Sequence, residues 1–478
     1  MKRREFLEYS IKSCLAGCLF SDTILNAMQI SNIVKRPNFI VIMADDLGWG
    51  DLACYGHPRI KTPNIDKLAK EGTLFTNFYC NAAICSPTRA AMMTGKFPAR
   101  VGVHAQISTK KQMEKLDSAY FLDPKYETLP RLLQKNGYTT LHSGKWHLAG
   151  WLHQDASLPC PDKYGFDEYR VRYLSWPDWK DSTYIPHSTE LFVDEGIKMI
   201  EARDVNKPFY LQLWLTDPHE PIMPEEDQTH CYDDIKPGRP YDKQPDREPQ
   251  RMYWSVVTEM DKQIGKLIKK IDELGIREDT YIIFTSDNGA ALSSSYDIYV
   301  GMGSNGPFRG QKGSLYEGGI RTPFIISKPG TVPSGKVDHE SIISGVDFLP
   351  TFCKLAEVAL PDSLELDGEN ISSCLNGNPD IRSKPLMWQW RFAQARETLH
   401  KSPMLAIREN KWKLLINPDM SRVELYDIKK NPEETDNLAD KYPEIVKNMS
   451  KQLLEFHKSL PEGIMDTHAG SNDYPWPN

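Results

Sequence analysis

Uninterrupted apolar runs that alternate with helical patterns constrain the fold of this chain more than any other feature. Four such runs are predicted to be strands: residues 38–44, 138–142, 209–215 and 281–285. Amphipathic helical patterns separate them, at residues 65–70, 129–135, 250–274 and 346–356. Runs such as NFIVIMA at 38–44 are apolar throughout, as in strands that are buried on both faces. The alternation predicts an α/β fold in which a large, mostly parallel sheet is sandwiched by helices.

After about Leu375 the pattern changes to short strands joined by tight turns. These strands are predicted at residues 385–390, 404–408, 411–416 and 424–428, with a final helix at 444–460. A small C-terminal antiparallel sheet plus helix, packed on the main domain as a subdomain, fits this stretch better than an independent module. We therefore expect a leader over 1–34, the main α/β domain over 35–375 and a C-terminal α+β subdomain over 376–478.

Composition excludes several classes of protein. The 478 residues are 40% hydrophobic and 10% aromatic, which is ordinary for a globular enzyme. The net charge of −7, with no run of Lys and Arg beyond the N-terminus, argues against a nucleic-acid partner. An anionic ligand must therefore be bound by a few clustered cations. The nine cysteines include no CxxC pair and no zinc-like spacing, so no disulfide pairing can be predicted.

The N-terminus, MKRREFLEYSIKSCLAGCLF, has the layout of an export signal: a basic cluster followed by a short apolar run. RREFL resembles a twin-arginine signal, and LAGC, which ends at Cys18, resembles a bacterial lipoprotein box. Lys12 interrupts the apolar run, so an unprocessed basic N-terminus is the alternative. We expect an exported protein, periplasmic or at the cell surface, with Cys18 as the candidate lipid anchor. No other apolar run approaches the ~20 residues of a membrane span.

Polar side chains follow all four predicted strands of the main sheet where each strand ends. They are Asp45 and Asp46, Asp287 and Asn288, Lys145 and His147, and Asp217 and His219. Each set alone could form a turn, because Asp, Asn and Gly are turn formers. The carboxyl ends of parallel strands meet at one edge of the sheet, where doubly wound folds bind ligands. Four coinciding sets therefore predict an active site at this edge.

The residue types in this set indicate the chemistry of the site. Its oxygen ligands are Asp45, Asp46, Asp287 and Asn288. Its cations and proton carriers are Arg89, Lys145, Lys312, His147 and His219. Hard oxygen ligands suit Ca²⁺ or Mg²⁺ rather than zinc. A metal ion with cations and two histidines is suited to an oxyanion undergoing transfer, and sulfate and phosphate both fit.

Cys85 does not match the rest of this set. It precedes a predicted helix in NAAICSPTRAAMMTG, with Ser86 expected as the N-cap and Pro87 at the first helical position. Arg89, one turn further on, adds a positive field that favours anionic chemistry. Most free cysteines are buried and structural, which is the ordinary alternative. A soft thiolate beside a calcium-type cage would be chemically mismatched.

The stretch Cys85-Ser86-Pro87-Thr88-Arg89 matches the C-x-P-x-R signature of the type I sulfatases, and the chain resembles this family along most of its length. The other similar segments, in family order, are ADDLGWGD, TGKFPARVGVH, HSGKWHL, TDPHEP, TSDNG and RGQKGSLYEGGIRTP. The resemblance implies an alkaline-phosphatase-like fold. It also implies that a formylglycine-generating maturation enzyme oxidises Cys85 to Cα-formylglycine. The hydrate of that aldehyde presents oxygen instead of sulfur, which would remove the mismatch.

The resemblance implies a role for each site residue. One Ca²⁺ per chain would be held by Asp45, Asp46, Asp287, Asn288 and the modified Cys85. Lys145 and Lys312 would neutralise the sulfate oxygens, and Arg89 would orient the hydrate, one hydroxyl of which attacks sulfur. His219 would protonate the leaving oxygen. His147 would deprotonate the second hydroxyl, so that the covalent sulfate ester breaks down to the aldehyde and free sulfate.

The chain most resembles carbohydrate sulfatases of the N-acetylgalactosamine-6-sulfatase-like kind. This implies a sulfated saccharide substrate with galactose or N-acetylgalactosamine. Selectivity is expected from segments outside the shared motifs, at 173–184, 292–304 and 388–396. The candidate sugar-binding side chains are Trp176, Trp179, His187, Trp390 and Arg391. For each of them simple packing is the alternative.

Other functions stay open at this point. Phosphonate and phosphate diester hydrolases of the same superfamily can carry the C-x-P-x-R signature. A glycan-binding relative without turnover would keep Cys85 unconverted. A cysteine hydrolase is the weakest alternative, because no Cys/His pairing of that type is evident and the two acidic pairs would have no use.

Overall fold

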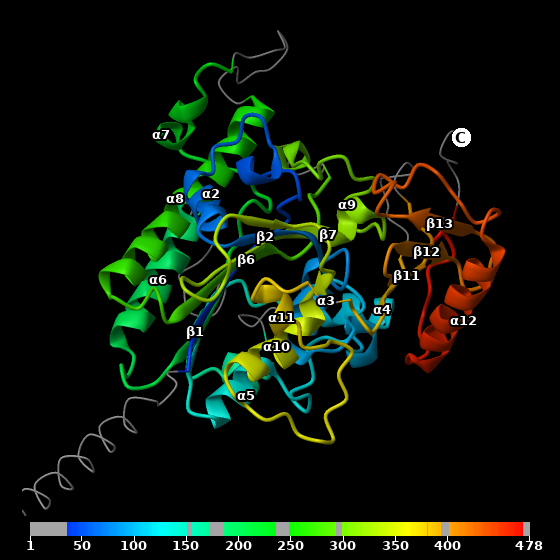
Figure 1. Cartoon of the computed structure of the whole chain (residues 1–478), viewed down its shortest axis with the longest axis horizontal. Coiled ribbons are helices and arrows are strands. Elements are labelled where there is room, and N and C mark those ends of the chain that lie inside the picture. Colours follow the sequence, from blue (N-terminus) through cyan, green and yellow to red (C-terminus); the bar gives the residue numbers. More distant parts are fainter. Residues whose placement is uncertain are drawn as a thin grey trace, which may run out of the picture. The chain divides into compact units, whose positions relative to one another are not determined.

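Two β-sheets organise the described part of the chain (Figure 1). The structure is a computed structural model that describes residues 36–150, 155–171, 185–235, 248–292, 299–379, 381–392 and 401–471. The expected leader over 1–34, with Cys18, lies outside the described residues. Both sheets belong to one compact unit, residues 37–478.

The large sheet has nine strands in the order β4-β3-β5-β1-β6-β7-β2-β8, with β9 paired to β2. The strands are β1 (Asn38–Ala44), β2 (Thr73–Tyr79), β3 (Thr139–Gly144), β4 (Glu168–Val171), β5 (Phe209–Trp214), β6 (Thr280–Ser286), β7 (Arg321–Ser327), β8 (Lys336–Asp338) and β9 (Ile343–Ser344). Strands β4, β3, β5, β1 and β6 are mutually parallel, whereas β7 is antiparallel to both β6 and β2. The predicted mostly parallel sheet is confirmed.

Helices cover both faces of this sheet. Successive residues of β1 point to opposite faces and so belong to two different hydrophobic cores. Phe39, Val41 and Met43 pack against α3 (Cys85–Thr94), α5 (Leu129–Lys135) and α10 (Phe348–Leu355). Ile40, Ile42 and Ala44 pack against α2 (Pro63–Lys70), α6 (Ser188–Ala202) and α8 (Pro249–Glu273). Figure 1 shows these two helix layers on opposite sides of the sheet. A strand buried on both faces must be apolar at every position, which is the pattern that predicted it.

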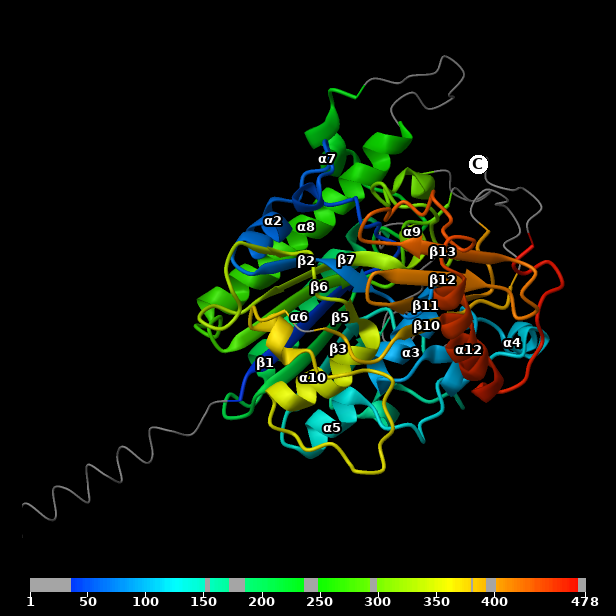
Figure 2. The same cartoon turned by 45° about the vertical axis from the view of Figure 1, so that its right-hand side comes forward.

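The C-terminal sheet is separate and antiparallel, in the order β10-β11-β12-β13. Its strands are β10 (Leu386–Gln389), β11 (Leu405–Glu409), β12 (Trp412–Ile416) and β13 (Val423–Asp427). Helix α12 (Pro443–Ser459) packs against this sheet, as Figure 2 shows. The predicted small antiparallel sheet plus helix is confirmed. The shorter helices are α4 (Lys110–Leu116), α7 (Glu226–Thr229), α9 (Glu317–Ile320) and α11 (Ser372–Leu375).

A buried group of charged side chains, which we name the interdomain cluster, joins the two sheets. It consists of Tyr79, Glu317 and Arg321 from the main domain and Arg408, Lys413 and Glu434 from the C-terminal subdomain. Lys413 Nζ lies 2.9 Å from Glu317 Oε1 and 2.9 Å from Glu434 Oε1. The main-chain N–H of Glu317 also donates to Glu434 Oε2, at 2.6 Å. These contacts bind the subdomain to the main domain by charge as well as by apolar packing.

Within the described ranges, no helix combines the length and the apolar character that crossing a membrane requires.

Candidate functional site

The four predicted strand ends come together because β3, β5, β1 and β6 are consecutive neighbours in the large sheet. Main-chain hydrogen bonds continue the pairing just beyond the strands. The N–H of Asp45 donates to Asp217 O at 3.0 Å, that of Lys145 to Trp214 O at 2.8 Å, and that of Asp287 to Ala44 O at 3.3 Å. The first polar residues after neighbouring strands therefore lie side by side at one edge, where such sheets bind ligands.

Three aspartates form the acidic centre of this site. Asp45, Asp46 and Asp287 are 0%, 2% and 0% exposed. Single ligand atoms of Asp45, Cys85 and Asp287 all lie within 4.8 Å of one another, and so do those of Asp45, Asp46 and His219. Carboxylates at this depth lose their hydration, so they need positive partners in direct contact.

Each of the three carboxylates has a close cation. Lys145 Nζ lies 2.5 Å from Asp45 Oδ2, Lys312 Nζ 2.7 Å from Asp46 Oδ2, and Arg89 Nη2 2.7 Å from Asp287 Oδ2. Lys145 directly follows β3, Arg89 lies in α3 and Lys312 in the 307–316 loop, three segments that are far apart in sequence. The structure thus unites every oxygen ligand and every cation that the sequence analysis selected for the site.

Electrostatics keep Asp45 and Asp46 charged. Burial alone would raise the pKa of Asp45, but Lys145 and the other neighbouring positive groups outweigh it and hold the pKa below its ordinary value. Lys312 and the groups around it likewise hold the pKa of Asp46 down against burial. Asp287 differs: burial and the charge of Asp45 raise its pKa to about 7, and Arg89 offsets this only in part. The three cations thus leave one of the three carboxylates undercompensated.

Two oxygen atoms of the acidic centre lack partners. Asp45 Oδ1 and Asn288 Oδ1 are buried and make no hydrogen bond to any described residue. The Asn288 amide donates its Nδ2 to Asp46 Oδ1 at 2.8 Å, which leaves the amide oxygen unused. Buried polar atoms are nearly always paired, so orphaned oxygens in a set of carboxylates and one amide fit a hard cation such as Ca²⁺.

Cys85 lies at the first position of α3, and its side chain is fully buried. Burial raises the pKa of the thiol above its ordinary value, although Lys145 and Lys312 act to lower it. The unmodified side chain is therefore a neutral thiol at physiological pH. A neutral buried thiol is neither a good metal ligand nor a good nucleophile.

The expected N-cap at Ser86 is wrong. The helix begins two residues earlier than expected, at Cys85, because Ile84 has the extended backbone of a cap (φ −159, ψ 155) and Pro87 is the third helical residue. The Ser86 hydroxyl accepts a hydrogen bond from the main-chain N–H of Ile107 instead, at 3.0 Å.

The two candidate histidines differ in their surroundings. His147 Nε2 lies 2.9 Å from the carbonyl oxygen of Ile107, while His147 Nδ1 is buried without a partner among the described residues. Burial, followed by the charge of Lys145, lowers the pKa of His147 well below its ordinary value. His219 Nδ1 lies 2.7 Å from Glu220 O, and its Nε2 is 3.8 Å from Asp46 Oδ2. Burial lowers the pKa of His219 as well.

The backbone of the site is unusual at two of these residues. Asp46 and His147 have φ values of 66° and 56°, in the left-handed region that non-glycine residues seldom adopt. Such conformations persist only where the surroundings hold them, and they gather at functional sites.

Two of the predicted sugar-binding residues, Trp390 and Arg391, are buried by packing. Trp390 is 7% exposed and packs edge-on against Phe392, with ring centroids 5.8 Å apart. Arg391 is 3% exposed and donates to Gln389 Oε1 and Pro461 O. Both follow the packing alternative, so stacking of a sugar on Trp390 has no support in the structure.

His187 is bound from both sides, with Nδ1 3.0 Å from Glu190 and Nε2 3.2 Å from Glu225. It connects the starts of α6 and α7 and offers no ring nitrogen to a sugar. Trp176 and Trp179 lie outside the described residues.

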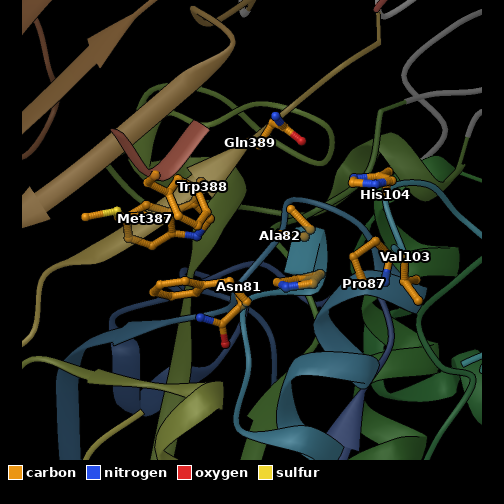
Figure 3. Close-up of a pocket in the computed structure, with 12 residues that line it drawn as sticks. Asn81, Ala82, Pro87, Val103, His104, Met387, Trp388 and Gln389 are labelled. Carbon is orange, nitrogen blue, oxygen red and sulfur yellow. The ribbon is translucent and has the colours of Figure 1, made fainter. Parts of the chain in front are cut away.

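A cavity of about 10 Å³ lies beside the first turn of α3 (Figure 3). Pro87, Asn81 and His104 line it from the main domain, and Gln389 of β10 from the C-terminal sheet. This volume suits one water molecule rather than a sugar. The C-terminal subdomain thus reaches the helix that carries Cys85.

Sequence reasoning missed three residues that shape the site. Asp51 accepts hydrogen bonds from Gly48 N, Ser304 N and Tyr253 OH, and so fixes the segment after β6 against the loop that carries Asp45. Burial raises its pKa to about 7. Its position in ADDLGWGD was a usable signal. The other two residues have no such signal in the sequence: they are Ile107 and Trp214, whose ring lies 5.0 Å from the Arg89 guanidinium.

Comparisons with known proteins agree with this geometry. A family model described as Sulfatase matches residues 37–358, and one described as N-sulphoglucosamine sulphohydrolase, C-terminal, matches residues 307–459. Human N-acetylgalactosamine-6-sulfatase is 31% identical over 372 residues, which span 72% of this chain but only 66% of that protein. Human arylsulfatase A is 33% identical over 371 residues, 72% of this chain and 69% of that protein.

Other similar proteins align with this chain over nearly their whole length. The N-acetylgalactosamine-6-O-sulfatase of Bacteroides thetaiotaomicron is 26% identical over 514 aligned residues, 89% of this chain and 94% of that protein. A crystal structure of Ps i-CgsB in complex with k-i-k-neocarrahexaose has a TM-score of 0.74 and 27% identity, and covers 92% of this chain and 97% of its own. The phosphonate monoester hydrolase of Agrobacterium radiobacter shares the fold, with a TM-score of 0.64 and 21% identity over 88% of this chain and 96% of that one.

Proposed function

The chain belongs to the sulfatase family, and from this premise we propose that it is a sulfuric ester hydrolase that removes sulfate from a sulfated carbohydrate. One observation carries the proposal. Oxygen ligands and three cations gather around Cys85 at the carboxyl edge of the sheet, and two histidines lie beside the same aspartates and lysines. Such a set matches an oxyanion ester in both charge and proton chemistry.

We assign the metal site to Asp45, Asp46, Asp287, Asn288 and residue 85, with Ca²⁺ as the ion. Support comes from the two orphaned oxygens and from the three aspartates that dominate the grouped residues, which otherwise comprise His219 and the thiol of Cys85. When bound, the ion would add positive charge beside the sulfate group. It would also satisfy Asp287, the carboxylate that the three cations undercompensate.

Residue 85 is proposed to act as Cα-formylglycine, formed from Cys85 by a maturation enzyme. The neutral thiol supports this, because in its unmodified form the side chain lacks the reactivity that its central position calls for. The hydrated aldehyde would supply hydroxyl groups in place of sulfur, and hard oxygen suits the neighbouring ligands.

The three cations divide into two kinds. The side chains of Lys145 and Lys312 are 14% and 18% exposed, whereas that of Arg89 is fully buried. The lysines can therefore reach the oxygens of an entering sulfate group while they stay paired with aspartates. Arg89, fixed between Asp287 and the carbonyl oxygen of Lys145, orients residue 85. The planar, rigid guanidinium group of arginine is suited to this orienting role.

The two histidines are assigned opposite proton tasks. His219, whose side chain is 22% exposed, is assigned as the acid in its cationic form: Nδ1 donates to Glu220 O, so only the cationic ring also carries a proton on Nε2 and can pass it to the leaving oxygen of the alcohol. His147 Nδ1, which is unpartnered and belongs to a ring with a lowered pKa, accepts a proton at the side of residue 85. Neutral imidazole is the form that accepts a proton, so the low pKa keeps His147 ready as a base.

The test is a parallel assay of one alcohol as its sulfate ester and as its phosphate ester, with the mature protein. Sulfate release at a much higher kcat/KM supports the proposal. Faster phosphate or phosphonate hydrolysis would support the rival hydrolase with the same fold. The mass of the peptide that carries residue 85 separates a third outcome, because unconverted cysteine would indicate a glycan-binding protein without turnover.

For the sugar we propose galactose or N-acetylgalactosamine. The similarity to proteins named N-acetylgalactosamine-6-sulfatase from mammals and to an N-acetylgalactosamine-6-O-sulfatase from a bacterium supports this choice. A pair of substrates that differ only in configuration at C4 tests it. Faster turnover of the gluco-configured sulfate would overturn the sugar assignment but not the sulfatase assignment.

Export remains a proposal that rests on the basic N-terminus and its apolar run. Cell fractionation of a bacterial host that expresses the full chain tests it. Replacement of Arg3 and Arg4 by lysine should retain the protein in the cytoplasm if the signal is of the twin-arginine type, and Cys18→Ser should abolish lipid attachment if it is a lipoprotein.

A further inference from the structure

We propose that Ser86 is a positioning residue that fixes the tautomer of His147 through the main chain of Ile107. Ser86 is the variable second residue of the C-x-P-x-R signature, and its hydroxyl does not cap α3. Four hydrogen bonds support the positioning role, whereas its catalytic consequence rests on the function proposed above.

The first contact connects the signature to the 102–107 loop. The main-chain N–H of Ile107 donates to Ser86 Oγ at 3.0 Å, and both residues are buried. Pro87 lies beside Val103 and His104, so the loop runs along the first turn of α3 (Figure 3). Because this contact is closed to water, no solvent molecule can replace the hydroxyl if it is removed.

The second contact connects the loop to the histidine. The Ile107 carbonyl oxygen lies 2.9 Å from His147 Nε2. A carbonyl oxygen can only accept a hydrogen bond, so Nε2 must carry the proton. In a neutral ring the other nitrogen then has a free lone pair, and Nδ1 is the buried nitrogen without a partner. Ile107 therefore selects Nδ1 as the basic atom.

The loop is anchored on its other side too. The main-chain N–H groups of His104 and Ala105 both donate to Ser118 Oγ, at 3.0 and 3.1 Å. Ser86 and Ser118 thus hold the two ends of the 104–107 segment. Without Ser86, the end that carries the Ile107 carbonyl loses its anchor, whereas the end at Ser118 keeps it.

The charged groups around His147 make this fixed carbonyl important. Lys145 and Arg89 oppose protonation of the ring, and Asp45 favours it. The Ile107 carbonyl is the hydrogen-bond acceptor that stabilises the ring once Nδ1 has taken up a proton. Partners of this kind orient a catalytic or metal-bound imidazole, and their loss typically costs ~10–100-fold.

The experiment compares the parent with Ser86→Ala, with Ser86→Thr, which keeps the hydroxyl, and with Thr94→Ala as a control. Thr94 is a fully buried residue of the same helix whose hydroxyl donates to Ala90 O and accepts from Lys96 N. The primary readout is the tautomer of His147, from ¹⁵N–¹H spectra of histidine-labelled protein in which Cys85 is unconverted. This measurement needs no activity and no modification.

We expect the Nε2–H tautomer in the parent, in Ser86→Thr and in Thr94→Ala, and a mixture of both tautomers in Ser86→Ala. In matured protein, normalised for conversion of residue 85 by mass, Ser86→Ala should lower kcat about 10–100-fold with little change in KM. KM should stay nearly constant because the substitution does not alter Lys145 and Lys312, which bind the sulfate group.

An unchanged Nε2–H signal in Ser86→Ala would overturn the inference, even if the melting temperature falls. A tautomer change in a protein whose parent hydrolyses no sulfate ester would leave the positioning role intact and overturn the proposed function. The two failures are therefore distinguishable.

Discussion

The molecule contains two buried clusters of charge, and the contrast between them indicates which one is a functional site. In the interdomain cluster, both oxygens of Glu317 and of Glu434 face a cation or a donor within 2.9 Å. At the strand edge, by contrast, Asp45 Oδ1 and Asn288 Oδ1 face no donor among the described residues. Every carboxylate oxygen of Glu317 and Glu434 thus has a positive or donating neighbour, although Glu434 Oε1 and Arg408 Nε make no hydrogen bond among the described residues, whereas the two strand-edge oxygens would gain a partner only from a further cation.

The two clusters also differ in the solvent exposure of their charged side chains. Lys413, Glu317 and Glu434 have fully buried side chains, so no ligand can reach them. Lys145 and Lys312 are paired with aspartates but keep 14% and 18% of their side chains exposed. A pKa shift and burial mark both clusters equally, so these alone do not identify an active site. Orphaned ligands together with reachable cations do.

The largest expected effect separates function from folding in the strand-edge cluster. Cys85→Ala should reduce turnover by about 10⁶-fold, the scale expected when a catalytic nucleophile is removed. Its melting temperature should stay close to that of the parent, because a methyl group replaces a small buried thiol. Sulfate release and thermal unfolding, measured on the same preparation, check this.

The matched control is Cys80→Ala, at a fully buried cysteine five positions earlier whose thiol donates to the carbonyl oxygens of Ala82 and Ile320. It should keep its activity. Activity well above background in Cys85→Ala would rule out residue 85 as the nucleophile and would remove the contrast between the clusters.

The interdomain cluster should respond in the opposite way. Lys413→Met leaves two buried carboxylates without their shared cation, which should destabilise the protein by about 3–5 kcal/mol. Turnover per folded molecule should change little, because the cluster does not reach the site. Lys411→Met, at an exposed lysine two residues earlier, serves as the control and should be nearly neutral. Denaturant unfolding and specific activity measure the two effects, and a large loss of activity at unchanged stability would contradict the division.

The third prediction addresses the missing cation. Asp287→Ala should weaken calcium binding by more than about 100-fold, because a hard cation loses a charged ligand. Calorimetric titration of the metal-free protein with Ca²⁺ measures this. Asp261→Ala removes an equally buried aspartate, which hydrogen bonds to the start of α2 instead, and should bind Ca²⁺ like the parent. Equal affinities in the Asp287 variant and the parent would show that residues 45–46 and 287–288 do not share an ion.

Much of this contrast was accessible from sequence, because the relevant signals are local. Strand β1 and helix α5 have the boundaries that the apolar pattern predicted, and the four polar strand ends converge as expected. Once neighbouring strands are taken to be parallel, a single rule places the site: ligands bind beyond the carboxyl ends of the strands. The site could therefore be assembled without knowledge of any side-chain contact.

What could not be predicted depends on partners distant in the chain. Strand β7 contains Arg, Thr and Pro as well as apolar residues, and its antiparallel direction is set by pairing with β2 and β6. The importance of Ile107 lies in a main-chain carbonyl, which has no signature in the sequence. Trp390 and Arg391 looked suited to sugar binding, and only the packed structure shows that they are buried.

The smallest expected effect concerns pH and the interdomain cluster. Burial raises the pKa of Glu434 from 4.5 to about 7, and the charge of Glu317 adds to this while Lys413 opposes it. Between these two values the folded protein holds a proton that the unfolded chain has released. Stability from this proton is therefore fully present below pH 4.5 and is lost as the pH rises through 7.

In Glu434→Gln the side chain cannot titrate, so this loss is absent, although the amide oxygen can still accept from Glu317 N. The variant should gain at least about 2 °C in melting temperature relative to the parent between pH 5 and pH 8. Every other titrating group, including Asp51 of the site, is common to both proteins and cancels in the difference. Parallel melting curves over this range would mean that Glu434 stays ionised in the folded state, and that the interdomain cluster is held by charge alone.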